Sequence, residues 1–174
     1  MSTADGAANR LNGWGGNDEL YGKAGNDVLI GGAGRDRLVG GGGADDLYGN
    51  LHDSGHYENV MSGDVFAFLS TSDSTVIGMD VIHDFNRGHI GAPGQPSEPG
   101  DRIDLSAIDA NTAATGNQAF AFVGDQDFTA AGQVRYHFSG GNTYVAANIG
   151  GSLAAEFLLE IEGIVNLNAS DFIL

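Results

Sequence analysis

The sequence predicts an all-β protein in two parts, a solenoid of very short strands and an antiparallel β-sandwich that caps the end of the solenoid. A nine-residue motif occurs four times in succession between residues 13 and 48. Fourteen of the 29 glycines lie before residue 51, whereas all nine phenylalanines lie at residue 66 or beyond. In the second half, short segments alternate apolar and polar residues with the period of two that is typical of β-strands.

The repeated motif is Gly-Gly-x-Gly-x-Asp-x-U-x, where U is a large apolar residue. Leucine recurs at residues 11, 20, 29, 38 and 47, and aspartate at residues 18, 27, 36 and 45. Neither a helix nor an ordinary strand requires this period of nine. We interpret x-U-x as a three-residue strand with its apolar side chain inward, and the six preceding residues as a turn. A flexible glycine-rich linker is the alternative, but it would not keep leucine in register.

The turns have the composition of a metal site. Glycine reaches positive φ at low cost and leaves backbone carbonyls uncovered, so that several carbonyls can converge. Aspartate at the sixth position brings a carboxylate to the same place. Because the cage contains only oxygen and the chain has no cysteine, it suits Ca²⁺, with its roughly six to eight oxygen ligands, better than zinc or copper. Calcium is therefore the predicted ligand.

Two motifs form one coil of the predicted solenoid, so every second turn stacks on the same side. An ion between stacked turns would pair Asp18 with Asp36 on one edge, and Asp27 with Asp45 on the other. Successive carbonyls should alternate in direction, so that positions one and three face one ion and positions two and four the next. The predicted carbonyl ligands are Gly22, Ala24, Gly31, Gly32, Ala33, Gly34, Gly40, Gly41, Gly42 and Gly43.

The motif resembles the nonapeptide repeats of the RTX family, calcium-binding proteins that Gram-negative bacteria export. This resemblance implies a parallel β-roll with calcium in its turns. It is specific for fold and ion but weak for biological role, because proteases, lipases, toxins, epimerases and adhesins all carry such repeats.

Composition and charge exclude several kinds of partner. The net charge of −16, from 23 acidic and seven basic residues, would make a compact fold repel itself unless cations neutralise it. The basic residues are scattered along the chain, so neither nucleic acid nor an anionic membrane surface is an expected partner. No apolar run approaches membrane-spanning length. The absence of cysteine fits a secreted protein that metal stabilises in place of disulfides.

We expect the first part to span residues 1–62. It begins as an incomplete repeat, with Asn9 where aspartate belongs and without the features of a Sec signal peptide, so one interpretation is a fragment of a larger protein. After Tyr48, a further motif closes only at Asp64, which is a further candidate ligand. The insertion between them contains His52 and His56, spaced for a transition-metal site; a polar surface loop is the alternative that we favour.

The second part, residues 63–174, is expected to have an ordinary aromatic and aliphatic core. Packed on the end of the roll, its β-sandwich would cover the strand edges that an open solenoid exposes. All three prolines lie in the segment 86–100, which we expect to be an exposed loop. The strand candidates are 64–69, 80–85, 102–105, 120–123, 133–138, 143–149 and 157–161.

This second part resembles the C-terminal domain of the serralysins, the peptidase M10 family. The similarity rests on Asp73-Ser-Thr-Val, Asp80-Val-Ile-His-Asp-Phe85, Gly100-Asp-Arg-Ile-Asp-Leu-Ser106 and Asp171-Phe-Ile-Leu174. In that family, three acidic residues after the final repeat complete the last calcium sites. They correspond here to Asp73, Asp80 and Asp101, although the segment before Asp101 is longer than the family pattern. Asp84 and Asp104 have the alternative roles of capping turns or pairing with Arg102.

The same resemblance implies an export signal at the chain end. The family's type I ABC secretion machinery recognises an acidic residue followed by a few apolar ones, a pattern that Asp171, Phe172, Ile173 and Leu174 match. A last β-strand is the alternative, and both can hold because export precedes folding. The expected location is extracellular.

We expect a module without catalytic activity. The five histidines do not form the H-E-x-x-H zinc motif of the serralysin proteases, and no G-x-S-x-G elbow occurs. The expected function is a folding, secretion and stability module that orders when calcium binds, because ordering each residue costs about 1 to 2 kcal/mol. Two alternatives are an adhesion or carbohydrate-binding module, and the C-terminal fragment of a larger secreted metalloprotease or polysaccharide-modifying enzyme.

Overall fold

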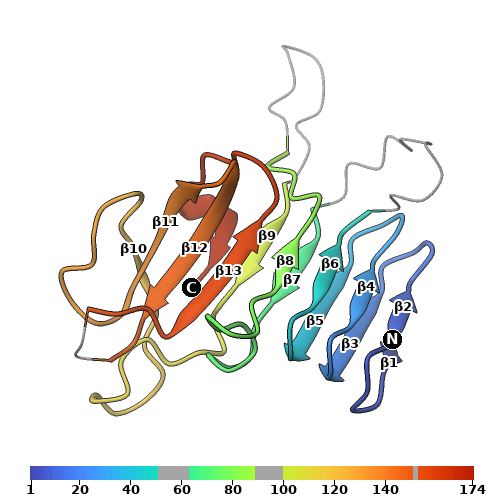
Figure 1. The fold of residues 1–174 in the computed structure, drawn as a ribbon, viewed down its shortest axis with the longest axis horizontal. Coiled ribbons are helices and arrows are strands. Elements are labelled where there is room, and N and C mark those ends of the chain that lie inside the picture. The colour runs from blue at the N-terminus through green and yellow to red at the C-terminus, as the bar shows by residue number, and fades with distance from the viewer. Residues whose placement is uncertain (51–62, 89–99, 151–152) are drawn as a thin grey trace.

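The structure is a computed structural model that describes residues 1–50, 63–88, 100–150 and 153–174. The insertion with His52 and His56 lies outside the described residues, as do the three prolines. The described chain forms two β-sheets that enclose a shared core (Figure 1). Its one helical element is the short 3₁₀ turn η1 (Ala169–Asp171).

The first sheet has six strands in the order β1-β3-β5-β7-β9-β14, and every neighbouring pair in it is parallel. Strands of two to six residues are too short to be stable alone, so their order depends on stacking against neighbouring coils. The strands are β1 (Ser2–Thr3), β3 (Glu19–Ala24), β5 (Arg37–Gly42), β7 (Val65–Ala67), β9 (Arg102–Asp104) and β14 (Phe172–Ile173).

The second sheet has eight strands in the order β10-β11-β12-β13-β8-β6-β4-β2. Among the described strands, only the β11–β12 and β12–β13 pairs are antiparallel. The strands are β2 (Arg10–Asn12), β4 (Val28–Ile30), β6 (Asp46–Tyr48), β8 (Val81–Ile82), β10 (Ala121–Phe122), β11 (Gln133–Ser139), β12 (Asn142–Asn148) and β13 (Phe157–Ile161).

The motif leucines form two inward ladders, one in each sheet. Leu20 pairs with Leu38 in the six-stranded sheet, and Leu29 pairs with Leu47 in the eight-stranded sheet. All four side chains are fully buried. Each pair is separated by 18 residues, so two motifs make one coil. The predicted all-β fold with a parallel β-roll is confirmed.

The roll extends further along the chain than the sequence indicated. Residues 64–69, 80–85 and 102–105 were expected in the antiparallel sandwich, yet β7, β8 and β9 pair in parallel with the roll. The reason is that Asp-x-U persists there as Asp64-Val-Phe66, Asp80-Val-Ile82 and Asp101-Arg-Ile103, with longer connections. Both sheets therefore contain strands from before and from after residue 63. The division of the chain into residues 1–62 and 63–174 as two domains stays a prediction.

The aromatic core lies where the antiparallel strands join the roll. Phe68 packs edge-on against Phe157 at 5.0 Å between ring centroids, and Phe122 packs against Phe172 at 5.1 Å. The two contacts join four separate segments of the second half in pairs. Aromatic residues thus fill the space between the sheets in this part of the core. In the repeats, leucine fills the corresponding space.

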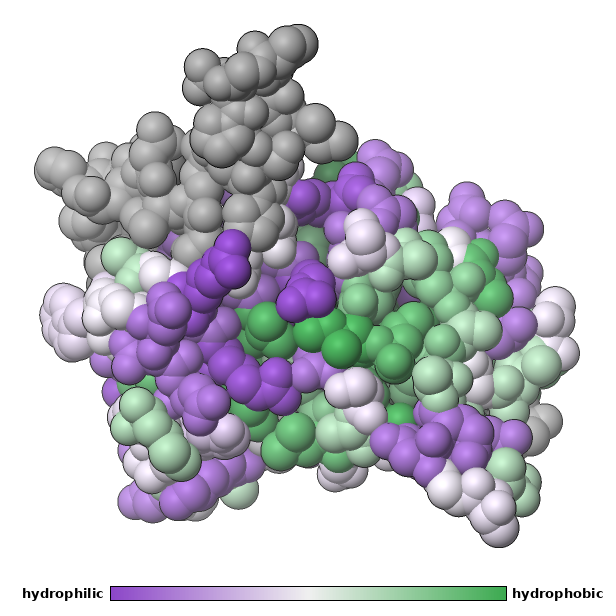
Figure 2. All heavy atoms as spheres, turned by 180° about the vertical axis from the view of Figure 1, so that it is seen from behind, coloured by the Kyte–Doolittle hydropathy of each residue, from purple (hydrophilic) through white to green (hydrophobic). Residues whose placement is uncertain are grey.

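The outer face of the six-stranded sheet carries an apolar centre with hydrophilic residues around it (Figure 2). Val39 and Ala67 follow the inward residues Leu38 and Phe66, so alternation places them on this outer face. Both are nevertheless buried, with 4% and 1% of their surface exposed.

The described part of the chain contains no helix long and apolar enough to span a membrane.

Candidate metal centre

The aspartates at the sixth motif position stack along one edge of the roll in a continuous ladder. The backbone N–H of Asp18 donates to Oδ1 of Asp36 at 2.7 Å. The N–H of Asp36 in turn donates to Oδ1 of Asp64 at 2.9 Å, and that of Asp64 to Oδ1 of Asp101 at 2.8 Å. We call these four residues the first aspartate ladder. Consecutive members of the ladder lie up to 37 positions apart in the sequence.

The opposite edge carries a second aspartate ladder, which consists of Asp27, Asp45 and Asp80. The N–H of Asn9 donates to Oδ1 of Asp27, and the N–H of Asp27 to Oδ1 of Asp45, both at 2.7 Å. The N–H of Asp45 completes the ladder by donating to Oδ1 of Asp80 at 2.9 Å. The structure thus brings together the residue pairs that the motif spacing predicted.

In five of the seven ladder residues, the second carboxylate oxygen has no hydrogen-bond partner. Within the part of the chain that the structure describes, Oδ2 is buried and makes no hydrogen bond in Asp27, Asp36, Asp45, Asp64 and Asp80. Buried charged oxygens of this kind are costly unless a counter-charge binds them. Five such atoms in repeated positions are therefore candidate ligands for cations.

Burial changes the acidity of the ladder carboxyls in the metal-free chain. Removal from water raises the pKa of Asp45 to about 6, of Asp64 to about 8 and of Asp80 to about 9. Burial also raises the pKa of Asp101 to about 7. Neighbouring ladder carboxylates add to the rise at Asp45, Asp64 and Asp80, because like charges disfavour ionisation.

The first glycine of a motif keeps open the space beside the partnerless Oδ2 atom. A Cβ on Gly22 would lie 2.4 Å from the carbonyl oxygen of Gly40 and 2.6 Å from Oδ2 of Asp27. A Cβ on Gly31 would likewise lie 2.5 Å from Oδ2 of Asp36. Since carbonyl and carboxylate oxygens of adjacent coils converge there, any larger residue would fill the space.

The turn carbonyls alternate in direction, as expected. At positions one and three they point to the preceding coil: the Gly40 oxygen approaches Gly22, and the Ala33 oxygen accepts the N–H of Gly16. At positions two and four they point to the following coil. A Cβ on Gly32 would lie 2.3 Å from the Trp14 oxygen, and one on Gly34 2.0 Å from the Gly16 oxygen.

The remaining predicted carbonyl residues occupy equivalent places on the other edge. Gly41 and Gly43 approach the oxygens of Lys23 and Gly25 as Gly32 and Gly34 approach theirs. The Gly42 oxygen accepts the N–H of Gly25, and Ala24 pairs with Gly42 between β3 and β5. Both edges therefore present the same arrangement of oxygens.

Of the three acidic residues after the repeats, Asp80 and Asp101 join the ladders, whereas Asp73 does not. Oδ2 of Asp73 accepts the backbone N–H groups of Leu69 at 2.7 Å and Ser70 at 3.0 Å, so it caps a turn. After burial and the ladder neighbours, its charge still contributes to the raised pKa of Asp45 and Asp80. Asp73 therefore lies near the end of the second ladder.

Two further aspartates, one partly buried and one buried, have structural roles that the motif spacing did not specify. Asp84 accepts the N–H groups of Gly49 and Asn50 at 2.8 Å each, and so caps the turn that follows the last complete repeat. Asp104 pairs with Arg37 at 2.7 Å. The alternative that Asp104 pairs with Arg102 is therefore wrong, because Arg37 reaches it from two strands away across the small Ala67.

The donor set fits Ca²⁺. No three His, Cys, Asp or Glu side chains of the described residues form a group that could hold a metal without other ligands. An ion between coils would instead combine carboxylates with backbone carbonyls, which is the oxygen-rich coordination that calcium prefers. The partnerless Oδ2 atoms and the open space beside the first glycines both meet this requirement.

Comparison with known proteins extends over almost the whole chain. A family model described as peptidase M10 serralysin C terminal matches residues 13–174. The solution structure of the AlgE6R3 subunit from the Azotobacter vinelandii mannuronan C5-epimerase is 27% identical, with a TM-score of 0.57 over 96% of this chain and 78% of that one. The AlgE6R2 subunit of the same enzyme is 20% identical, with a TM-score of 0.49 over 98% and 94%.

Proposed function

Because this chain belongs to the peptidase M10 serralysin C-terminal family, we propose that its RTX-type β-roll is a calcium-dependent folding and stability module of a secreted protein. The family and the roll imply calcium binding in general terms. The observation that best supports the specific role is the row of five buried carboxylate oxygens without partners. The proposed ligand side chains are Asp18, Asp27, Asp36, Asp45, Asp64, Asp73, Asp80 and Asp101.

In the proposed mechanism, the ladders make folding depend on charge. Stacking of the coils brings carboxylates together at an interval of 18 residues and buries them. Their repulsion and their loss of water both oppose the docking of one coil on the next. Bound calcium would supply the positive charge that offsets this cost. The turn carbonyls would complete each site from the adjacent coil.

A calcium titration of the metal-free protein, followed by circular dichroism and calorimetry, tests this proposal. We expect β-structure to appear cooperatively as several ions bind. Asp36→Asn should remove more than one site, because Asp36 is hydrogen-bonded to the coil before it and to the coil after it. Asp125→Asn, which changes an exposed aspartate outside the ladders, is the matched control. Unchanged native structure in chelator would exclude calcium-gated folding.

We further propose that Asp171, Phe172, Ile173 and Leu174 act in export before the chain folds. In the folded chain these residues are already used: Asp171 binds Arg87, and Phe172 pairs with Ile103 and is buried. Recognition by a type I ABC machinery therefore requires the unfolded state. Removal of the four residues should abolish export in a reconstituted system, while Val76→Ser, at an exposed loop position, should leave it unchanged.

A second candidate is an accessory module of a polysaccharide-modifying enzyme, which the likeness to the AlgE6R3 subunit favours. In that case the catalytic activity would belong to another segment of the polypeptide, and this chain would stabilise it. The coding sequence around this segment decides between the two candidates. A catalytic epimerase segment on the same polypeptide would support the second.

A further inference from the structure

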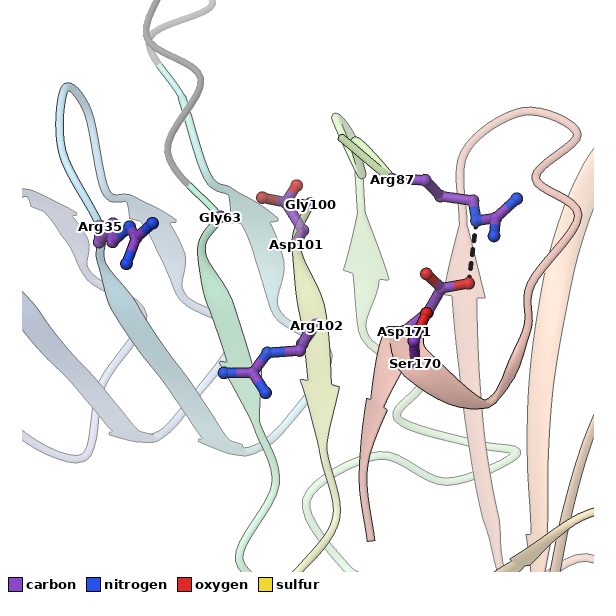
Figure 3. Close-up of a pocket in the computed structure, with 8 residues that line it drawn as sticks. All are labelled: Arg35, Gly63, Arg87, Gly100, Asp101, Arg102, Ser170 and Asp171. Carbon is purple, nitrogen blue, oxygen red and sulfur yellow. Dashed lines mark hydrogen bonds and ion pairs between the residues drawn. The ribbon is translucent and has the colours of Figure 1, made fainter. Parts of the chain in front are cut away.

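A pocket of about 240 Å³ lies beside the first aspartate ladder, where the roll meets the C-terminal turn (Figure 3). Three arginines line it, from the turn before β5, the segment after β8 and the strand β9. We call it the arginine pocket, and its lining residues are Arg35, Gly63, Arg87, Gly100, Asp101, Arg102, Ser170 and Asp171. Although basic residues are few and scattered in the sequence, three of the seven line this pocket.

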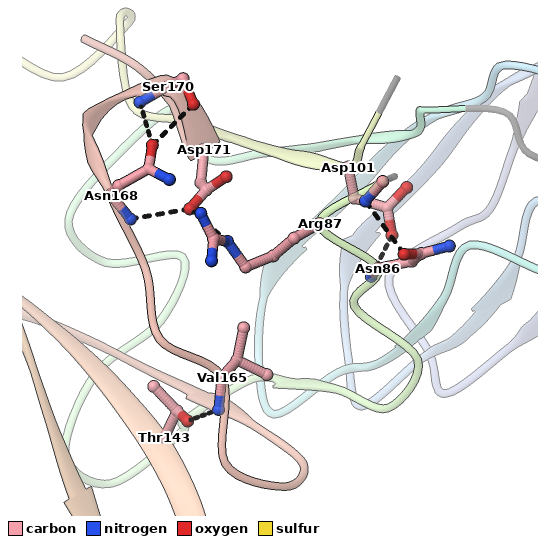
Figure 4. Close-up of polar contacts among 9 residues, drawn as sticks. Asn86, Arg87, Asp101, Thr143, Val165, Asn168, Ser170 and Asp171 are labelled. Atoms are coloured by element: carbon pink, nitrogen blue, oxygen red, sulfur yellow. Dashed lines mark hydrogen bonds and ion pairs between the residues drawn. The ribbon is translucent and has the colours of Figure 1, made fainter. Parts of the chain in front are cut away.

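The two carboxylates of the pocket are already bound within the protein. Oδ2 of Asp171 accepts Nε of Arg87 at 2.9 Å and the backbone N–H of Asn168 at 2.7 Å (Figure 4). Both oxygens of Asp101 accept backbone N–H groups, one from Asp64 and one from Asn86, at 2.8 Å each. Neither carboxylate reaches Arg35 or Arg102.

The arginines, by contrast, retain unused donors. Within the described chain, the guanidinium groups of Arg35 and Arg102 make no ion pair or hydrogen bond, and Arg87 binds Asp171 through Nε alone. This is notable because acidic residues outnumber basic ones by 23 to seven. Arg37 and Arg135 do pair with aspartates. The pocket therefore concentrates unsatisfied positive charge on a strongly negative molecule.

We propose that the arginine pocket binds one compact oxyanion, a carboxylate or sulfate group of an extracellular ligand. The planar guanidinium fork matches the geometry of such groups and remains charged at all physiological pH values. The volume is smaller than the roughly 300 Å³ at which pockets for larger organic ligands begin, so the pocket takes a single group. Arg87, which also lines the pocket, is held by its ion pair with Asp171 and keeps its two terminal nitrogens as further donors.

The test is an NMR titration of the ¹⁵N-labelled protein with sodium glucuronate and, separately, sodium sulfate. Methyl glucoside serves as the uncharged control and sodium chloride as the ionic-strength control. We expect saturable shifts of the Arg Nε–H signals and of the Gly100 amide with at least one oxyanion. A response to glucuronate alone assigns a carboxylate, and a response to sulfate alone assigns a tetrahedral group.

Two variants locate the site. Arg35→Gln combined with Arg102→Gln should weaken binding about tenfold or more, since the change removes charge-assisted hydrogen bonds to the anion. Arg135→Gln, outside the pocket, should leave it unchanged. Equal effects of both changes, shifts that chloride reproduces, or no saturable shift in a folded spectrum would overturn the proposal. A spectrum that stays folded in chelator would count against calcium-gated folding and leaves the anion titration interpretable.

Discussion

The buried ladder carboxyls give the metal-free protein an unusual dependence on pH. Their pKa values in the folded chain, about 6 for Asp45, 8 for Asp64 and 9 for Asp80, lie above the ordinary value of 3.8. The proton is therefore bound more tightly in the folded state. Their stabilising contribution is fully present below pH 3.8 and is lost as pH rises through about 6 to 9.

We accordingly predict more residual β-structure in chelator at pH 5 than at pH 8. Saturating calcium should reverse the order, because the proposed ligands must be ionised to bind it. Circular dichroism at the two pH values, with and without calcium, measures both effects. The same trend in chelator and in calcium would show that the ladder carboxyls do not control stability.

The first glycine of the motif offers a test of the open space itself. Gly31 does not have a positive φ, so alanine there causes no backbone strain, but its Cβ would lie 2.5 Å from Oδ2 of Asp36 and 2.7 Å from the Gly49 oxygen. We predict that Gly31→Ala lowers stability in calcium by about 1 to 3 kcal/mol. Gly6→Ala, where nothing lies within 4 Å, should have no comparable effect. Chemical denaturation of both variants measures the difference.

Among the elements, β6, β8 and β13 are joined by one histidine. His83 lies 2.8 Å from Asp46 through Nε2 and 2.9 Å from Glu162 through Nδ1, and its ring stacks on Tyr48 at 4.4 Å. Both ring nitrogens can donate only in the imidazolium form. The bridge therefore connects the repeats to the antiparallel strands most firmly when His83 is charged.

Burial by itself lowers the pKa of His83, but the hydrogen bonds to Asp46 and Glu162 outweigh it and raise the pKa above 6.5. The bridge should stabilise the protein fully below pH 6.5 and weaken as pH rises through the raised pKa. We predict that NMR titration gives His83 a higher pKa than His137, whose pKa burial and then Arg135 lower. The reverse order would contradict a charged bridge.

Much of the element order follows from local sequence. The period of nine specifies the coil, the buried leucines and the paired aspartates, because each of these depends on residues in one motif. In the second half the period fails, since connections of different lengths separate Asp64, Asp80 and Asp101. Only the short Asp-x-U signal remains, and the period of two in these segments predicts sandwich strands instead.

The candidate sites likewise differ in whether the local sequence predicts them. Stacked carboxylates and alternating carbonyls could be predicted because the turns repeat. The arginine pocket could not be predicted, since long-range strand pairing is what brings Arg35, Arg87 and Arg102 to the lining of one pocket. The pairing of Arg37 with Asp104 likewise depends on how β7 separates their strands.

For the whole molecule, the net charge of −16 should determine its size in solution. Without cations, repulsion favours an expanded chain with a radius of gyration near the roughly 44 Å of an unfolded chain of this length. With calcium we predict a decrease toward about 16 Å, the value for a compact domain. Small-angle X-ray scattering measures this change. Magnesium, which prefers tighter octahedral coordination, should be less effective at equal concentration. An unchanged radius would contradict the prediction.

Because residues 18 apart pair with each other, an insertion of an odd number of motifs should differ in its effect from an insertion of an even number. One added motif, such as a duplicate of residues 40–48, would move every later strand to the opposite sheet, so that β7 would no longer pair with β5. Two added motifs, such as a duplicate of residues 31–48, would lengthen the roll and return each strand to its own sheet. The length of the roll can thus change in steps of 18 residues, much as a coding sequence changes in steps of one codon, without redesign of the C-terminal part.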